Sequence, residues 1–243
     1  MMSSPSHSHG RFSTTRWSVV MHVATAPDGD ARTALAELVQ RYWYPVYAYA
    51  RRSGHTPKIA EEIARSFLGL LVEDFRGGTE LQSHGHFRRF LLDRLDKFLG
   101  GDWRETVDAQ EGADLVPPTD LEPRYGRDNA DTASPSAAYE RSFALEVISR
   151  ALKRLRSEAG RAAHLPMFSA LEPFLARDPS PAQYEQIAGQ LSSRPLALIV
   201  ALKRLRQRLR ELVGEELADT VTSPEELAAE QSALHSILRR TPQ

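Results

Sequence analysis

Apolar residues recur along most of this chain at steps of three and four, the spacing that places them on one side of a helix. The pattern is clearest in residues 58–75, 84–104, 139–160 and 180–214. Alternating apolar and polar residues, which would indicate a strand, do not form a run anywhere in the sequence. We therefore predict an all-α protein in which each helix buries one apolar face.

Residues 180–214 combine a short helical pattern with a long one. The short pattern ends at Leu191, and the polar residues 192–194 separate it from the long one. Proline has a fixed φ angle that suits the first turn of a helix, so we expect the second helix to begin at Pro195. Two helices joined by so short a turn predict a helix-turn-helix.

The second helix of this pair is strongly basic. Between positions 194 and 210 it has no acidic residue, and a phosphate backbone is the obvious partner for such a face. A solvated basic face on an ordinary helical hairpin explains the same residues equally well. The six basic residues are Arg194, Lys203, Arg204, Arg206, Arg208 and Arg210.

A second basic segment, residues 84–104, interleaves cations with aromatic residues. This mixture suits single-stranded or melted nucleic acid, whose bases stack on rings and whose phosphates attract cations. Core packing beneath a charged surface is the alternative explanation. The side chains concerned are Arg88, Arg89, Arg94, Lys97, Trp103 and Arg104.

Five aromatic residues crowd positions 42–49, and we expect them to pack between helices. Their spacing is helical and they lie far from the strongest basic run, so core packing is favoured over stacking on bases.

Residues 105–138 change the character of the chain. They are acidic, rich in proline and glycine, and have little apolar periodicity, which is typical of an interdomain linker. We therefore predict two small helical domains, at 11–104 and 139–214, joined by a flexible acidic linker. Residues 1–10 indicate a disordered tail, and residues 215–243 an acidic helical tail at the carboxyl end.

The composition limits the classes of function that this protein can have. The net charge is −1, so any binding of nucleic acid must come from local segregation of charge. There is no cysteine, no apolar run near 18 residues and no amino-terminal signal pattern, so we expect a cytoplasmic protein that does not contact a membrane. We find no nucleophile motif, glycine-rich phosphate loop or metal-ligand cluster, and expect no enzyme activity, metal or cofactor.

Several strings of residues, in order along nearly the whole chain, resemble the extracytoplasmic-function sigma factors of bacterial RNA polymerase. The resemblance is to a divergent branch whose members begin with a segment like RFSTTRWS. The matching strings are RFSTTRWSVV (11–20), RYWYPVYAYARRSGHTP (41–57), HFRRFLLDRLDKFL (86–99), Tyr139-Glu140-Arg141, FSALEPFL (168–175) and LVGEELADTVTSPEEL (212–227).

The resemblance implies a non-catalytic subunit that binds core RNA polymerase through its first domain and promoter DNA through both. It leaves open whether an anti-sigma or other regulatory protein also binds. Polymerase docking by family position falls on Glu61, Glu62, Arg65, Ser66 and Leu68. DNA binding falls on Arg88, Arg89, Lys97, Trp103 and Arg104 in the first domain and on Arg194, Lys203, Arg204, Arg206 and Arg208 in the second.

Two departures from the family pattern motivate an alternative. Arg65 and Ser66 stand where relatives carry glutamine and glutamate, and Leu196 and Ile199 stand where the DNA-reading helix carries small polar or charged residues. The alternative is a sigma-derived interaction protein that keeps the fold but has weakened polymerase docking or promoter reading.

Overall fold

The computed structural model describes residues 37–76, 87–101, 103–104 and 117–239, and within them it is all-helical without a β-strand. The prediction of an all-α protein is confirmed. The elements are α3 (Trp43–Arg52), α4 (Pro57–Arg76), α5 (Phe87–Gly100), α7 (Leu121–Asn129), α8 (Pro135–Arg161), α9 (Leu165–Leu171), the 3-10 turn η1 (Glu172–Phe174), α10 (Pro181–Gln190), α11 (Pro195–Ala218) and α12 (Pro224–Arg239).

A first lobe, made of α3, α4, α5 and α7, holds the larger core. Its centre is aromatic: the ring of Tyr42 meets Phe87 edge-on at 5.0 Å between centroids and stacks on Phe143 at 5.4 Å. Trp43 and Tyr44 are also buried. The aromatic residues at 42–49 therefore pack between helices, as their spacing predicts.

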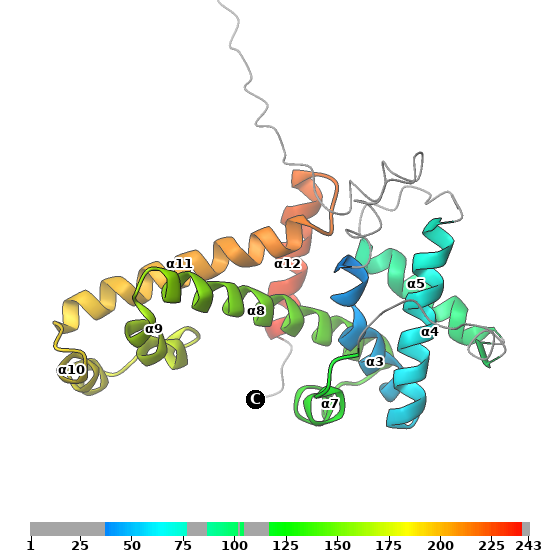
Figure 1. Ribbon diagram of the computed structural model, residues 1–243, viewed down its shortest axis with the longest axis horizontal. Coiled ribbons are helices and arrows are strands. Elements are labelled where there is room, and N and C mark those ends of the chain that lie inside the picture. Colours follow the sequence, from blue (N-terminus) through cyan, green and yellow to red (C-terminus); the bar gives the residue numbers. More distant parts are fainter. Residues whose placement is uncertain (1–36, 77–86, 102, 105–116, 240–243) are drawn as a thin grey trace, which may run out of the picture.

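Helix α8 begins at a well-formed cap, where the Ser134 side chain accepts a hydrogen bond from the amide of Ala137 and Pro135 opens the first turn. Its first half, including Tyr139 and Phe143, belongs to the core of the first lobe. Its second half packs along α11, and Figure 1 shows the two helices running side by side as a long arm. The predicted boundary at residue 139 therefore lies inside a helix that both halves of the molecule share.

The second half of the predicted linker is ordered, in contrast to the expectation of a flexible segment. Leu121 and Asn129 are buried, and the Asn129 amide donates to the hydroxyls of Tyr44 and Ser142 at 3.1 and 3.0 Å. Glu122 pairs with Arg51 at 2.7 Å. Glu122 thus helps to hold α7 against the first lobe. The composition of this segment does not reveal that pairing, because Arg51 lies far away along the sequence. Residues 105–116 lie outside the described part.

The helix-pair lobe, made of α9, η1, α10 and the start of α11, has a smaller core of its own around Leu171, Ile187, Leu198 and Leu202. Helix α10 starts with a reciprocal capping box between Ser180 and Gln183. A short turn, residues 191–194, then leads into α11, which Pro195 opens as predicted. The expected pair of helices is present, and its role as a DNA-binding helix-turn-helix stays a prediction.

Helix α12 returns from the end of α11 and packs on α8 and α11 (Figure 1). It contributes Leu234 to the core of the first lobe, so the predicted tail is part of the fold. None of the described helices is long and apolar enough to cross a membrane. The predicted tail at residues 1–10 lies outside the described residues.

Candidate nucleic-acid interface

The start of α11 carries cations that the fold does not use. Arg194, Lys203 and Arg204 are exposed, and none of them forms an ion pair with the residues that the structure describes. The opposite side of α11 packs on the lobe through Leu198 and Leu202, which are fully or almost fully buried in the helix-pair lobe. These three cations can therefore meet an anionic partner without breaking an internal contact.

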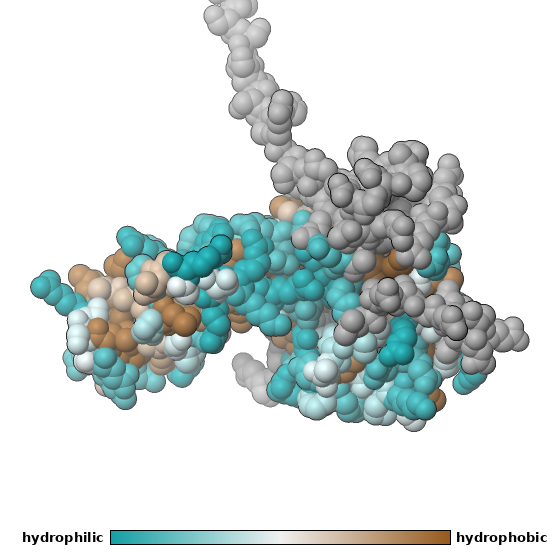
Figure 2. Space-filling model, in the orientation of Figure 1, coloured by the Kyte–Doolittle hydropathy of each residue, from teal (hydrophilic) through white to brown (hydrophobic). Residues whose placement is uncertain are grey.

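Apolar residues share this surface. Leu196, Ile199 and Val200 are 71%, 45% and 42% exposed, although aliphatic side chains of this size are usually buried. Positions 196, 199, 200 and 203 follow helical spacing, so these three residues and Lys203 form one face, here called the outer face of α11. Figure 2 shows apolar surface, in brown, gathered on the lobe at this end of the molecule.

Arg206, predicted to bind DNA, is a structural residue. Its guanidinium donates to the backbone carbonyls of Phe174, Leu175 and Arg177 at 2.8, 3.2 and 2.7 Å. It also pairs with Asp178 at 2.7 Å. Arg206 thus satisfies carbonyls at the end of η1 and the following turn and joins α11 to the chain before α10. Its donors are already occupied in the structure described, so a contact with DNA would have to replace these internal contacts, and its role in DNA binding stays a prediction.

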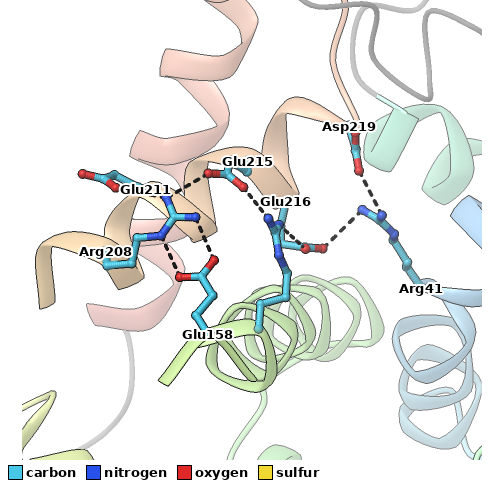
Figure 3. A network of polar contacts seen from close by, with 8 residues as sticks. Arg41, Glu158, Arg208, Glu211, Glu215, Glu216 and Asp219 are labelled. Carbon is cyan, nitrogen blue, oxygen red and sulfur yellow. Dashed lines mark hydrogen bonds and ion pairs between the residues drawn. The ribbon is translucent and has the colours of Figure 1, made fainter. Parts of the chain in front are cut away.

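Arg208 is likewise occupied, by carboxylates from two helices (Figure 3). It forms a two-pronged pair with Glu158 of α8, with N···O distances of 2.9 and 2.8 Å, and also contacts Glu211 and Glu215 at 3.1 Å each. The hydrogen bonds from Arg208 hold the pKa of the Glu158 carboxyl below its ordinary value. Arg208 therefore joins α8 to α11 and is not a free phosphate ligand.

The same ionic network continues toward the first lobe. Arg154 of α8 pairs with Glu215 and, at 2.9 Å, with Glu216, and Arg41 pairs with Glu216 and Asp219 at 3.3 and 2.9 Å. Figure 3 shows these side chains meeting between α8, the end of α11 and the turn before α3. The arrangement ties the arm to the first lobe with alternating charges.

Two predicted DNA-binding residues, one on α5 and one shortly after it, are inside the protein. Arg88 is only 4% exposed and forms a two-pronged pair with Glu230 of α12, at 3.1 Å for both contacts, and a further contact with Glu140. Trp103 is also buried, next to His55 and beneath the guanidinium of Arg104. Neither residue can reach nucleic acid, because the charge of Arg88 and the ring of Trp103 are both buried. Arg89, Lys97 and Arg104 remain exposed.

The predicted polymerase-docking residues divide in the same way. Ser66 and Leu68 face the interior of the first lobe, at 7% and 0% exposure, so they cannot contact a partner surface. Glu61, Glu62 and Arg65 lie on the accessible side of α4, where Arg65 approaches Glu61 at 3.5 Å. The available docking face is therefore a small charged stripe.

Reasoning from the sequence missed the acidic residues that neutralise the arginines, above all Glu158 and Glu230. The distance along the chain hides them: Glu230 lies 142 positions from Arg88, and Glu158 lies 50 positions from Arg208. The described residues contain no group of three or more His, Cys, Asp or Glu that could hold a metal ion.

Comparison with family models, with curated proteins and with solved structures finds no match for this chain.

Proposed function

We propose that this protein is a non-catalytic, sigma-type transcription initiation factor that acts in the cytoplasm and binds core RNA polymerase and promoter DNA. One observation carries the proposal: among the described residues, the exposed cations on the first half of α11 form no ion pair, while neighbouring arginines are neutralised internally. Residues 165–210 contain seven Lys or Arg and three Asp or Glu, in a chain with a net charge of −1. Such local segregation favours binding to a polyanion.

The proposed DNA contacts are Arg194, Lys203 and Arg204 in the helix-pair lobe and Arg89, Lys97 and Arg104 in the first lobe. Lysine and arginine contacts to phosphate fix the position of a protein on DNA without reading its sequence. In a helix-turn-helix, the second helix enters the major groove with its amino-terminal residues at the base edges. Arg194 lies directly before α11 and Lys203 and Arg204 lie within its first half, which is the part that this geometry would use.

Core polymerase is the proposed partner of the charged stripe on α4. Glu61, Glu62 and Arg65 offer both signs of charge on one accessible helix face, which suits a complementary charged surface. Their pairs within α4 are exposed and of i,i+4 type, and such pairs contribute little to stability, so they exchange readily for contacts to a partner.

The deciding experiment combines the purified full chain with core RNA polymerase and measures complex formation by gel filtration and transcript formation from a genomic fragment library. We expect a complex that initiates transcription. Replacing Glu61, Glu62 and Arg65 with alanine should weaken the complex at least tenfold. The control variant, Glu225→Ala with Gln231→Ala on the exposed side of α12, should not. Failure of the unmodified chain to bind core polymerase would exclude the proposal.

A second candidate, a sigma-derived interaction protein, is favoured by the exposed outer face of α11 and by the neutralisation of Arg206 and Arg208. Base edges are read largely through hydrogen bonds, which leucine, isoleucine and valine cannot make. If this candidate is right, the chain binds core polymerase or promoter DNA weakly and starts no transcript even where it occupies DNA. Transcripts from a promoter fragment incubated with core polymerase and this chain would favour the first candidate.

A further inference from the structure

The outer face of α11 has no structural use within the described residues. The buried side of this helix, with Leu198 and Leu202, already fills the small core of the helix-pair lobe. Leu196, Ile199 and Val200 point elsewhere and leave between two fifths and seven tenths of their surface open. Exposed aliphatic groups clustered on one turn of a helix indicate a contact surface for a partner.

The charges around the face indicate which partner it suits. Lys203 lies within the face, Arg204 follows it and Arg194 precedes the helix, all exposed and without an ion pair among the described residues. A second copy of the chain would bring these cations against one another. A stable protein interface buries about 800 Å² on each partner, more than one helical turn offers. A polyanion that presents apolar groups between its phosphates suits the surface better.

Duplex DNA presents such groups in its major groove, where each thymine carries a C5-methyl group that apolar side chains contact. We propose that Leu196, Ile199 and Val200 read thymine methyl groups while Arg194, Lys203 and Arg204 bind the flanking phosphates. This inference depends on the proposed DNA-binding function and deepens it. It makes the outer face a specificity surface that selects T·A pairs through contact with the methyl group.

The test removes or adds only the methyl group. Binding of the full chain is measured by fluorescence anisotropy on duplexes of about 24 base pairs, slightly more than two helical turns. The first pair consists of a duplex of alternating adenine and thymine and a duplex of the same sequence with deoxyuridine in place of thymine. The other has alternating guanine and cytosine, with or without 5-methylcytosine. We expect affinity to fall about fourfold for each contacted methyl lost with deoxyuridine, and to rise with 5-methylcytosine.

Variants then assign the effect to the face. Leu196→Ala combined with Ile199→Ala and Val200→Ala should abolish both methyl effects and keep most of the affinity for the deoxyuridine duplex. Arg204→Ala should weaken binding to all four duplexes alike. Leu165→Ala removes another exposed leucine, 41% open and outside the helix pair, and should change nothing.

Each other outcome overturns the inference. Binding that is equal with and without the methyl groups contradicts it and leaves the DNA-binding function intact. No binding to any duplex at low salt removes both. A synthetic acidic amphipathic peptide serves as a competing probe. If it binds the unmodified chain and not the triple variant, while the methyl groups have no effect, the face is a protein-docking surface instead.

Discussion

Helices α5 and α11 both have a basic face in the sequence, yet the fold uses their cations differently. On α5 the buried cation is Arg88, enclosed by carboxylates from α8 and α12. On α11 the paired cations, Arg206 and Arg208, lie beyond position 205, while Lys203 and Arg204 just before them stay exposed.

The difference shows that an arginine's role is set by what faces it. Arg88 meets Glu230, an acid 3% exposed, and the pair is closed off from water. Arg208 meets Glu158 along the open side of the arm, where water reaches both side chains. Lys203 and Arg204 form no ion pair with the residues that the structure describes. The loss of stability when an arginine is removed should therefore be largest for a buried pair, smaller for a partly exposed one, and absent for an exposed cation without a pair.

The largest effect is expected for Arg88→Ala. Removing one partner of a buried ion pair leaves the other charge buried and uncompensated, which costs about 3 to 5 kcal/mol. Urea unfolding, monitored by tryptophan fluorescence, measures the free energy of unfolding. The urea concentration at the midpoint of the transition should be much lower in this variant than in the unmodified chain. Glu230→Gln should cause a smaller loss, since the amide can still accept a hydrogen bond from Arg88.

The control is the adjacent Arg89→Ala. Arg89 is exposed, so its removal should change the free energy of unfolding by less than about 0.5 kcal/mol. If both variants lose the same stability, the buried pair does not set the difference between these neighbours.

An intermediate effect on stability is expected for Arg206→Ala, with Arg204→Ala as its counterpart. Arg206 holds three carbonyls and Asp178, so its loss should reduce the free energy of unfolding by about 1 to 3 kcal/mol. Arg204→Ala should leave stability unchanged and instead reduce the salt dependence of DNA binding by about 0.9 log units per log unit of salt. A salt slope unchanged by Arg204→Ala would show that this cation is merely solvated.

The smallest effect is expected from acid acting on the Glu158–Arg208 pair. The pKa of Glu158 is lowered in the folded protein, so the pair contributes stability above the ordinary glutamate pKa. That contribution is lost as the pH falls through the lowered pKa. The unmodified chain should therefore exceed Glu158→Gln in stability near neutral pH, and the gap should close on acidification. A gap that stays constant down to about pH 3 would contradict this assignment.

Local patterns determined much of this protein. Helical periodicity predicted an all-α chain, the proline at position 195 predicted the start of α11, and the aromatic spacing at 42–49 predicted that those residues pack between helices. These features succeed because they depend on residues a few positions apart, which interact within one helix whatever the rest of the fold does.

The tertiary structure alone decided which cations are available. Arg88 and Arg204 have similar surroundings in the sequence, with apolar and basic neighbours and no adjacent acid, yet one is buried and the other is exposed. The outcome depends on Glu230 and Glu140, which only the packing of α8 and α12 brings to α5. The burial of Ser66 and Leu68 was also decided by the tertiary structure. Which side of α4 faces the core depends on how α3 and α5 pack against this helix.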